Sequence, residues 1–241
     1  MKTLFISDLH LDLSRPAIIG QFEAFIRDEA AKADALYILG DLFEAWIGDD
    51  AEDEVGKRFV AAMRPMREAR KPCFFMHGNR DFLLGERFAR EAGMTLLPDP
   101  SVIDLYGTPT LLMHGDSLCT DDAPYQAFRR QSRSPEWQRQ FLAQDTQSRQ
   151  AFASQARQES QRYTGSKANA AIMDVNQDAV IDAMRAAKVT RLIHGHTHRP
   201  ATHRFNIDNQ PAARNVLNDW YQVGGVLRVI QGQALHAELG E

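Results

Sequence analysis

The first half of the chain alternates short apolar runs with longer stretches in which apolar residues recur at helical spacing. The apolar runs cover residues 3–7, 35–39 and 73–76, and the amphipathic stretches cover 16–33, 52–70 and 82–92. Runs of the first kind predict buried strands, and stretches of the second kind predict helices. Strand, helix, strand, helix in this order predicts an α/β layer architecture.

Each of these apolar runs ends in a polar cluster, and so do two later runs at 109–113 and 190–193. The clusters are Ser7-Asp8-Leu9-His10, Gly40-Asp41, His77-Gly78-Asn79-Arg80-Asp81, His114-Gly115-Asp116 and His194-Gly195-His196-Thr197-His198. Taken singly, such histidines are ordinary loop residues, and Asp8 and Asp41 could cap the helices that follow. Five ordered clusters at strand ends together favour a functional site, because open α/β sheets bind ligands there.

The segment from about 121 to 188 interrupts this alternation. It is rich in Gln, Arg, Ala and Ser, with aromatic residues at roughly helical intervals, which predicts a mainly helical insertion over the sheet. After residue 200, short strand-like runs with turn signals predict an antiparallel hairpin layer. We expect one domain spanning 1–241, in which residues 121–188 form a helical cap.

The composition adds limits on location. At 44% hydrophobic and 25% charged, the chain belongs to the ordinary globular class. The first apolar run is too short for a secretory signal, and no stretch approaches the roughly 18 to 20 apolar residues that span a bilayer, so we expect any membrane relation to be peripheral. Cys73 and Cys119 stand in apolar contexts that predict buried thiols of a reducing cytoplasm.

The charge is uneven along the chain. The net charge of −4 argues against a nucleic-acid partner. Residues 126–167 nevertheless carry eight basic and three acidic residues, a local charge of +5 that leaves −9 for the rest. The insertion is therefore a candidate for contact with anionic groups.

The five clusters also carry a family resemblance. DLH at 8–10, GD at 40–41, GNRD at 78–81, HGD at 114–116 and GHTH at 195–198 resemble the ordered motifs of the calcineurin-like metallophosphoesterases. The resemblance implies a β-sandwich flanked by helices in four layers, αββα. Within that superfamily, GNRD, the stretch LGDLFEAWIGDD and the helical insertion are similar to the UDP-2,3-diacylglucosamine pyrophosphohydrolases of the lipid A pathway.

The resemblance implies two metal ions that share one carboxylate. The family pattern places one Mn²⁺ on Asp8, His10, Asp41 and His198 and a second on Asp41, Asn79, His114 and His196. Oxygen and imidazole donors without thiolate suit Mn²⁺ and related ions, and a carboxylate such as Asp41 can bridge two metals about 3.5 to 4 Å apart. Asp116, His77 and His194 have no ligand role in the pattern, and we expect them to support the ligands.

Arg80 stands where many superfamily members have a histidine that protonates a departing alkoxide. An arginine has a pKa above about 12 and delivers no proton, but its planar fork holds phosphate oxygens. The alternative is a solvated surface residue. We expect a leaving group that needs no proton, namely a phosphate whose second pKa is about 6, and hence a phosphoanhydride substrate. The resemblance names UDP-2,3-diacylglucosamine, cleaved at the α-phosphorus, with Arg80, Asn79 and His196 in catalysis.

The resemblance also implies the substrate contacts, which are Asn79, Arg80, Asp122, Ser160, Thr164, Lys167 and His196. A basic, amphipathic insertion suits a diacylated sugar and an anionic membrane surface, which places the protein peripherally on the cytoplasmic side of the bacterial inner membrane. The alternative is that its aromatic residues only pack the insertion itself. No assembly signal appears, so we expect a monomer.

Three other functions compete with this one. The chain could be another dinuclear metallophosphoesterase that acts on nucleotide-sugar pyrophosphates or phosphodiesters. It could also be a metal-free scaffold that keeps only the fold, although the complete set of seven ligand residues disfavours this. A nuclease is disfavoured by the overall acidity and by the absence of a proton donor at position 80.

Overall fold

The computed structural model of the chain describes residues 1–51, 53–164, 174–222 and 224–233. The strands are β1 (Lys2–Ile6), β2 (Ala35–Leu39), β3 (Cys73–Met76), β4 (Met94–Leu97), β5 (Ser101–Leu105), β6 (Thr108–Met113), β7 (Arg191–His194), β8 (Ala201–Ile207), β9 (Gln210–Val216) and β10 (Leu227–Ile230). The α-helices are α1 (Pro16–Asp28), α2 (Glu54–Ala62), α3 (Arg64–Glu68), α4 (Glu86–Ala92), α5 (Ala123–Ser132), α6 (Pro135–Leu142), α7 (Thr146–Thr164) and α8 (Gln177–Ala186). Short 3-10 turns lie at η1 (Ala30–Lys32), η2 (Asp49–Ala51) and η3 (Asp116–Leu118).

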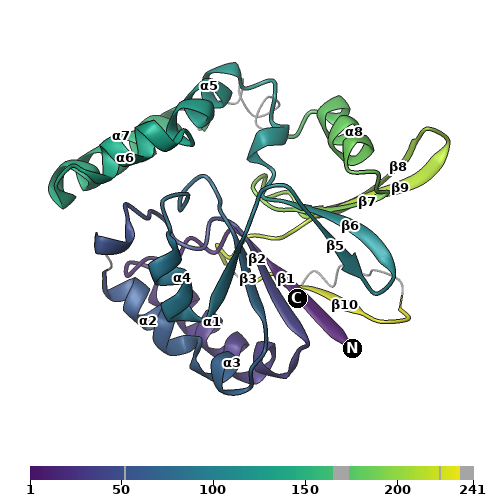
Figure 1. Cartoon of the computed structure of the whole chain (residues 1–241), viewed down its shortest axis with the longest axis horizontal. Coiled ribbons are helices and arrows are strands. Elements are labelled where there is room, and N and C mark those ends of the chain that lie inside the picture. The colour runs from purple at the N-terminus through teal and green to yellow at the C-terminus, as the bar shows by residue number, and fades with distance from the viewer. Residues whose placement is uncertain (52, 165–173, 223, 234–241) are drawn as a thin grey trace.

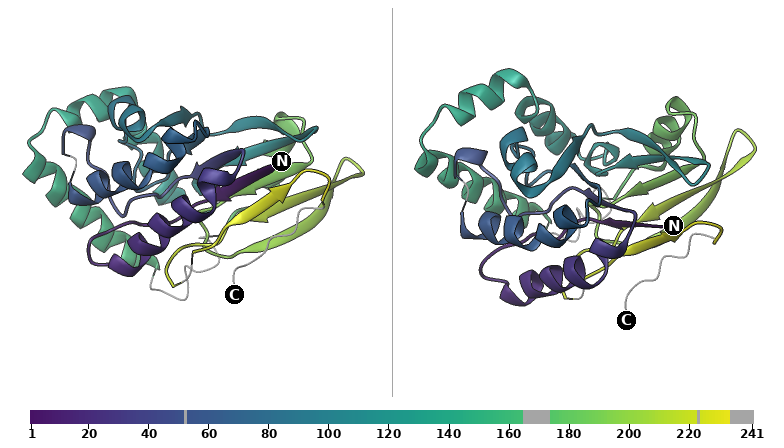
Figure 2. Two further views of the ribbon diagram at one scale, coloured as in Figure 1. Left: turned by 90° about the horizontal axis from the view of Figure 1, so that it is seen from below. Right: turned by 60° about the horizontal axis from the view of Figure 1, so that its bottom comes forward.

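Two five-stranded sheets face each other (Figures 1 and 2). The first has the order β10-β1-β2-β3-β4, with β1 to β4 parallel and β10 antiparallel to β1. The second has the order β5-β6-β7-β9-β8, in which β6, β7 and β9 are parallel and the edge strands β5 and β8 are antiparallel to their neighbours. The carboxyl ends of β1, β2 and β3 therefore share one edge of the first sheet, as those of β6 and β7 do in the second.

Buried side chains form three apolar layers. Alternation along β1 sends Leu4 and Ile6 toward the helices and Phe5 toward the second sheet, where it packs with residues such as Ile193. Helices α1 to α4 cover the outer face of the first sheet, and α8 covers the outer face of the second. The order helix, sheet, sheet, helix confirms the predicted αββα architecture.

The predicted insertion at 121–188 divides into two parts. Helices α5 to α7 form an arm on the side of the molecule where β1 to β3 end (Figure 1). Helix α8 instead packs through Val180 and Met184 on the second sheet and is one of the four layers. Within the arm, the Trp137 and Phe141 rings stack 4.8 Å apart, and Phe152 meets Phe141 edge-on. Phe141 and Trp137 also pack against the core that α1 to α4 form with the first sheet, and Phe152 is exposed, so the alternative that these residues only pack the insertion itself holds in part.

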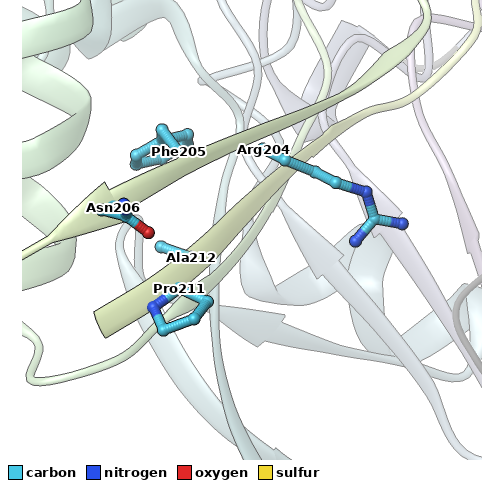
Figure 3. Close-up of a pocket in the computed structure, with 5 residues that line it drawn as sticks. All are labelled: Arg204, Phe205, Asn206, Pro211 and Ala212. Carbon is cyan, nitrogen blue, oxygen red and sulfur yellow. The ribbon is translucent and has the colours of Figure 1, made fainter. Parts of the chain in front are cut away.

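The C-terminal strands depart from the predicted hairpin layer. Strands β8 and β9 do form a hairpin, whose turn residues Asp208 and Asn209 have φ values of 49° and 64°, as a tight two-residue turn requires. Strand β10 instead crosses to the first sheet and pairs with β1. A shallow hollow on the hairpin, lined by Arg204, Phe205, Asn206, Pro211 and Ala212 (Figure 3), contains no predicted site residue.

Both cysteines are buried, and within the described residues neither forms a disulfide. Burial raises the pKa of both thiols, that of Cys119 to about 12, so they are protonated at neutral pH. In the part of the chain that the structure describes, no helix combines the length and the apolarity needed to cross a membrane.

We expect Leu112→Ala to lower the free energy of unfolding by about 2–5 kcal/mol, because Leu112 is fully buried between the two sheets and its loss leaves a cavity there. Urea denaturation measures the change. Val102→Ala on the neighbouring strand is the control, since Val102 is 51% exposed and its loss should cost less than about 0.5 kcal/mol. Equal effects of the two substitutions would contradict the assignment of an inter-sheet core.

Candidate metal centre

The loops after five strands converge where the two sheets meet. His114 Nδ1, after β6, lies 2.8 Å from the Leu39 carbonyl oxygen at the end of β2. Gly195 N, after β7, donates to the His114 carbonyl oxygen over 2.8 Å, and His196 N donates to Asp8 Oδ2 over 2.9 Å. These hydrogen bonds fix the polar clusters of both sheets in one place.

Six of the predicted ligand residues form two clusters. Their ligand atoms lie within 4.8 Å of one another in each cluster, and the members are Asp8, His10 and His198 in the first and Asp41, His114 and His196 in the second. Asp41 lies between the clusters, with Oδ2 3.7 Å from His10 Nε2 and Oδ1 3.7 Å from His114 Nε2. One carboxylate therefore has an oxygen facing a histidine of each cluster.

Asn79, the seventh predicted ligand residue, lies against the second cluster. Its Oδ1 is 2.9 Å from His196 Nδ1 and 3.1 Å from His114 Nε2. The fold thus brings all seven residues together, in the two groups that the sequence resemblance implied.

The backbone at these residues adopts conformations that non-glycine residues seldom occupy. The φ values are 57° at Asp8, 47° at His10, 52° at Asp41, 69° at His196 and 53° at His198. Each such residue costs about 1–3 kcal/mol of strain, and such residues concentrate at functional sites. The strained backbone conformations direct these side chains toward one place, which less strained turns would not do.

Two glycines permit the close approach of these loops. A Cβ atom at Gly78 would overlap the side chain and backbone nitrogen of Asp41, and one at Gly195 would overlap Ser7 and Asp8. Only glycine leaves room for the two carboxylates at these positions.

Several buried polar atoms in the clusters lack a hydrogen-bond partner among the described residues. They are Asp8 Oδ1 and both ring nitrogens of His10. Asp8 Oδ1 lies 3.4 Å from His198 Nε2, but the pair is not aligned as a hydrogen bond. Unpaired buried oxygen and nitrogen atoms are costly unless they coordinate a cation, so this donor set fits a divalent metal.

The carboxylates shift the pKa values of the groups around them. Burial disfavours a charged His114, but the charges of Asp41 and Asp116 outweigh it and raise its pKa to about 9. For Asp81, burial and the repulsion of Asp41 raise the pKa to about 6. Burial and the charge of His114 instead lower the pKa of His196 to about 4. The carboxylates that favour a charged His114 concentrate negative charge, which a divalent cation would compensate.

Comparison with known proteins identifies the family. The family model described as calcineurin-like phosphoesterase matches residues 1–200. The chain belongs to this family. Calcineurin-like phosphoesterases are metal-dependent hydrolases of phosphoesters or phosphoanhydrides, and the two clusters are where their divalent ions could bind in this chain.

Curated relatives match almost the whole chain. The UDP-2,3-diacylglucosamine hydrolases of Escherichia coli (strain K12) and Shigella sonnei (strain Ss046) are each 54% identical over 229 residues, which cover 95% of this chain and 95% of each relative.

Two of the solved structures that match are much less similar to this chain. Zinc-bound Vps29 from Entamoeba histolytica is 12% identical with a TM-score of 0.43, covering 96% of this chain and 88% of that one. The Aquifex aeolicus protein AQ665 is 16% identical with a TM-score of 0.37, covering 88% and 95%. At these scores neither structure bears on the function of this phosphoesterase.

The three residues predicted to support the ligands lie outside both clusters. His77 Nε2 is 2.7 Å from the Leu84 carbonyl oxygen, and His194 Nδ1 is 2.9 Å from that of Gly195. Asp116 Oδ2 accepts hydrogen bonds from the Tyr125 hydroxyl at 2.6 Å and from Arg129 Nε at 2.8 Å. Asp116 therefore joins α5 to the loop that carries His114.

Three residues beside the first cluster were missed by the sequence reasoning. Glu44 Oε2 lies 3.3 Å from His10 Nδ1, and Asp219 Oδ2 lies 3.6 Å from His198 Nδ1. The Tyr221 ring packs on the His10 ring at 5.5 Å. Glu44 could have been found from the sequence, since it follows Asp41 by three residues. Asp219 and Tyr221 lie far from the other residues of the first cluster in sequence, in the C-terminal part of the chain.

Asp8 and Asp41 do not cap the helices that follow them. Arg15 is the N-cap of α1, and the Asp53 carboxylate caps α2 by accepting from Val55 N and Gly56 N. The cap interpretation of these two aspartates is therefore wrong, and their carboxylates belong to the clusters.

The predicted substrate contacts beyond the clusters are only partly described. Arg80 is half-buried, its backbone N donates to Asp41 Oδ1 over 2.9 Å, and its Nε has no hydrogen-bond partner among the described residues. Asp122 is buried and caps α5 through Tyr125 N, and Ser160 is half-buried on α7. The Thr164 side chain and Lys167 lie outside the described residues.

We expect Gly78→Ala to reduce the metal that remains bound after dialysis, because the new Cβ would displace Asp41 from its place between the clusters. Elemental analysis of the dialysed protein measures this. Gly20→Ala is the matched control, since a Cβ there meets nothing within 4 Å, and it should retain the wild-type metal content. Wild-type content in Gly78→Ala would show that the position of Asp41 does not control metal binding.

Proposed function

We propose that this phosphoesterase hydrolyses the pyrophosphate bond of UDP-2,3-diacylglucosamine at the α-phosphorus, giving UMP and 2,3-diacylglucosamine 1-phosphate. The observation that carries the proposal is the placement of Arg80, whose backbone is bonded to the carboxylate between the two clusters. The 54% identity to UDP-2,3-diacylglucosamine hydrolases supports the substrate and the place in lipid A biosynthesis.

The proposed cofactors are two Mn²⁺ ions per chain. Asp8, His10 and His198 would hold one ion, Asn79, His114 and His196 the other, and Asp41 would bridge them. When bound, the metal pair would acidify a water for attack and neutralise charge on the phosphorus. The chain's own contribution is to fix these donors at the strained loop positions, so that the phosphate meets a preformed site.

Arg80 acts on the leaving group in this proposal. Arg80 is half-buried, and its Nε is buried without a hydrogen-bond partner among the described residues, which favours contact with phosphate oxygens over a solvated surface role. It stabilises the departing sugar phosphate by charge and paired hydrogen bonds and transfers no proton. A phosphoanhydride suits this arrangement better than an ester of an alcohol does, because a phosphate leaves without protonation.

The arm formed by α5 to α7 is the proposed site of lipid and membrane contact, with Asp122, Ser160, Thr164 and Lys167 as further substrate contacts. Four of its arginines are turned to the body of the protein and pair there with acidic or carbonyl groups: Arg129, Arg133, Arg149 and Arg157. Arg130, Arg139 and Arg162 are exposed. We propose that these three bring a monomeric, peripheral protein to the anionic cytoplasmic surface of the inner membrane.

Hydrolysis in ¹⁸O-enriched water tests the reaction and its direction. With Mn²⁺, detergent and UDP-2,3-diacylglucosamine, we expect the label in UMP alone, as read by mass spectrometry and phosphorus NMR. Label in the lipid phosphate would show that water attacks the other phosphorus, the one bound to the sugar. Equal turnover of non-acylated UDP-sugars would instead favour the alternative of a general nucleotide-sugar pyrophosphatase.

We expect Arg80→Ala to lower kcat/KM by about 10²- to 10³-fold, the usual loss when a charge-stabilising donor is removed from a transition state. Arg80→Lys should recover only part of this, because an ammonium lacks the planar fork. Arg90→Ala on the exposed surface of α4 is the control and should keep wild-type turnover. Unchanged turnover in Arg80→Ala would rule out this account of the leaving group.

A further inference from the structure

A chain of contacts joins the arm to the first cluster. Arg157 on α7 approaches Glu44 with Nε 2.9 Å from Oε1. The other carboxylate oxygen, Oε2, lies 3.3 Å from His10 Nδ1. Glu44 therefore touches a residue of the arm with one oxygen and a candidate metal ligand with the other.

The backbone holds Glu44 in this position. The segments after β1 and β2 continue side by side, with Leu11 N donating to the Leu42 carbonyl oxygen over 2.9 Å and Glu44 N donating to that of Leu11 over 3.2 Å. The Glu44 side chain is 10% exposed, whereas that of Arg157 is 45% exposed. The carboxylate is thus fixed by the core, and its partner on the arm lies at the surface.

His10 is oriented for this arrangement. Its Nε2 faces Asp41 at 3.7 Å, inside the centre, and its Nδ1 faces Glu44. A metal-binding histidine commonly donates its second ring nitrogen to a carboxylate, which fixes the ring and strengthens it as a ligand.

We propose that Glu44 is a positioning residue that couples helix α7 to the metal site of Asp8, His10 and His198. This inference rests on the proposed metal binding of that cluster. The contact of 3.3 Å between Glu44 Oε2 and His10 Nδ1 is not aligned as a hydrogen bond, but it places the carboxylate where it limits rotation of the His10 ring, and Arg157 holds the Glu44 carboxylate. Metal binding and docking of α7 therefore stabilise each other, since such coupling is reciprocal.

The same helix supplies a matched control. Arg149 on α7 also pairs with a carboxylate after β2, that of Asp50, and it donates to the Ile47 carbonyl oxygen over 2.7 Å. Neither Asp50 nor Ile47 belongs to a cluster. Arg149 thus anchors the arm as Arg157 does, but without a contact to a candidate ligand.

Titration of the apo protein with Mn²⁺, followed by electron paramagnetic resonance, tests the coupling without an activity assay. We expect Glu44→Gln to weaken the Mn²⁺ affinity of one of the two sites by about 10- to 100-fold. The spectrum of two magnetically coupled Mn²⁺ ions should then appear only at a higher Mn²⁺ concentration than in the wild type. Arg157→Gln should weaken the same site by about two- to fivefold, and Arg157→Lys should restore part of it. Arg149→Gln should bind Mn²⁺ as the wild type does.

Hydrogen exchange gives the reciprocal measurement. Added Mn²⁺ should slow the exchange of α7 amides in the wild type and in Arg149→Gln, and it should lose this effect in Glu44→Gln and Arg157→Gln. A folded Glu44→Gln variant with wild-type affinity at both sites would overturn the proposal. So would an equal loss of affinity in Arg149→Gln, which would show general loosening of the arm. A wild type that binds no Mn²⁺ would overturn the proposed function itself.

Discussion

The contact between His114 Nδ1 and the Leu39 carbonyl oxygen is the link on which the rest of the site depends. It joins the end of β2 in one sheet to the end of β6 in the other, and it leaves His114 Nε2 directed at Asp41 and Asn79. Without that junction, each sheet would carry only part of a donor set. The apolar layer between the sheets therefore does more than stabilise the fold, because packing of the two sheets places the loops of both next to each other.

The convergence of the loops has a cost that the surrounding hydrogen bonds offset. Asp8 and His10 both have positive φ values, and their backbone nitrogens are held by the carbonyl oxygens of Gly40 and Asp41, each at 3.0 Å. The strained segment after β1 is thus clamped to the equally strained segment after β2. Strain of this kind persists only where neighbouring contacts over-determine the backbone. The clamps also keep acidic side chains close together, which is unfavourable without a cation and favourable with one.

Much of this arrangement could be predicted from the sequence, because apolar runs that end in polar clusters mark the carboxyl ends of buried strands. The pattern located seven residues that the fold brings together, and the parallel order of β1 to β3 explains why clusters far apart in sequence meet. Strands β4 and β5 were not predicted, and β10, expected in the hairpin layer after residue 200, instead pairs with β1 because its path depends on packing between the sheets. Asp219 and Tyr221 were missed for the same reason, since only the crossing toward β10 brings them beside His198 and His10.

The basic character of the arm shows how far a charge count can mislead. Residues 126–167 suggested a surface for anionic partners, yet Arg149 is buried and bound to Asp50, and Arg133 donates to the Gly78 carbonyl oxygen. Arg129 pairs with Asp116 next to the second cluster, and Arg157 pairs with Glu44 next to the first. Four of the eight basic residues of the segment therefore face the body of the protein, and two of these, Arg129 and Arg157, pair with carboxylates next to the clusters. Because Arg129 pairs with Asp116 near His114 and Arg157 pairs with Glu44 beside His10, a movement of the arm would disturb contacts next to both clusters.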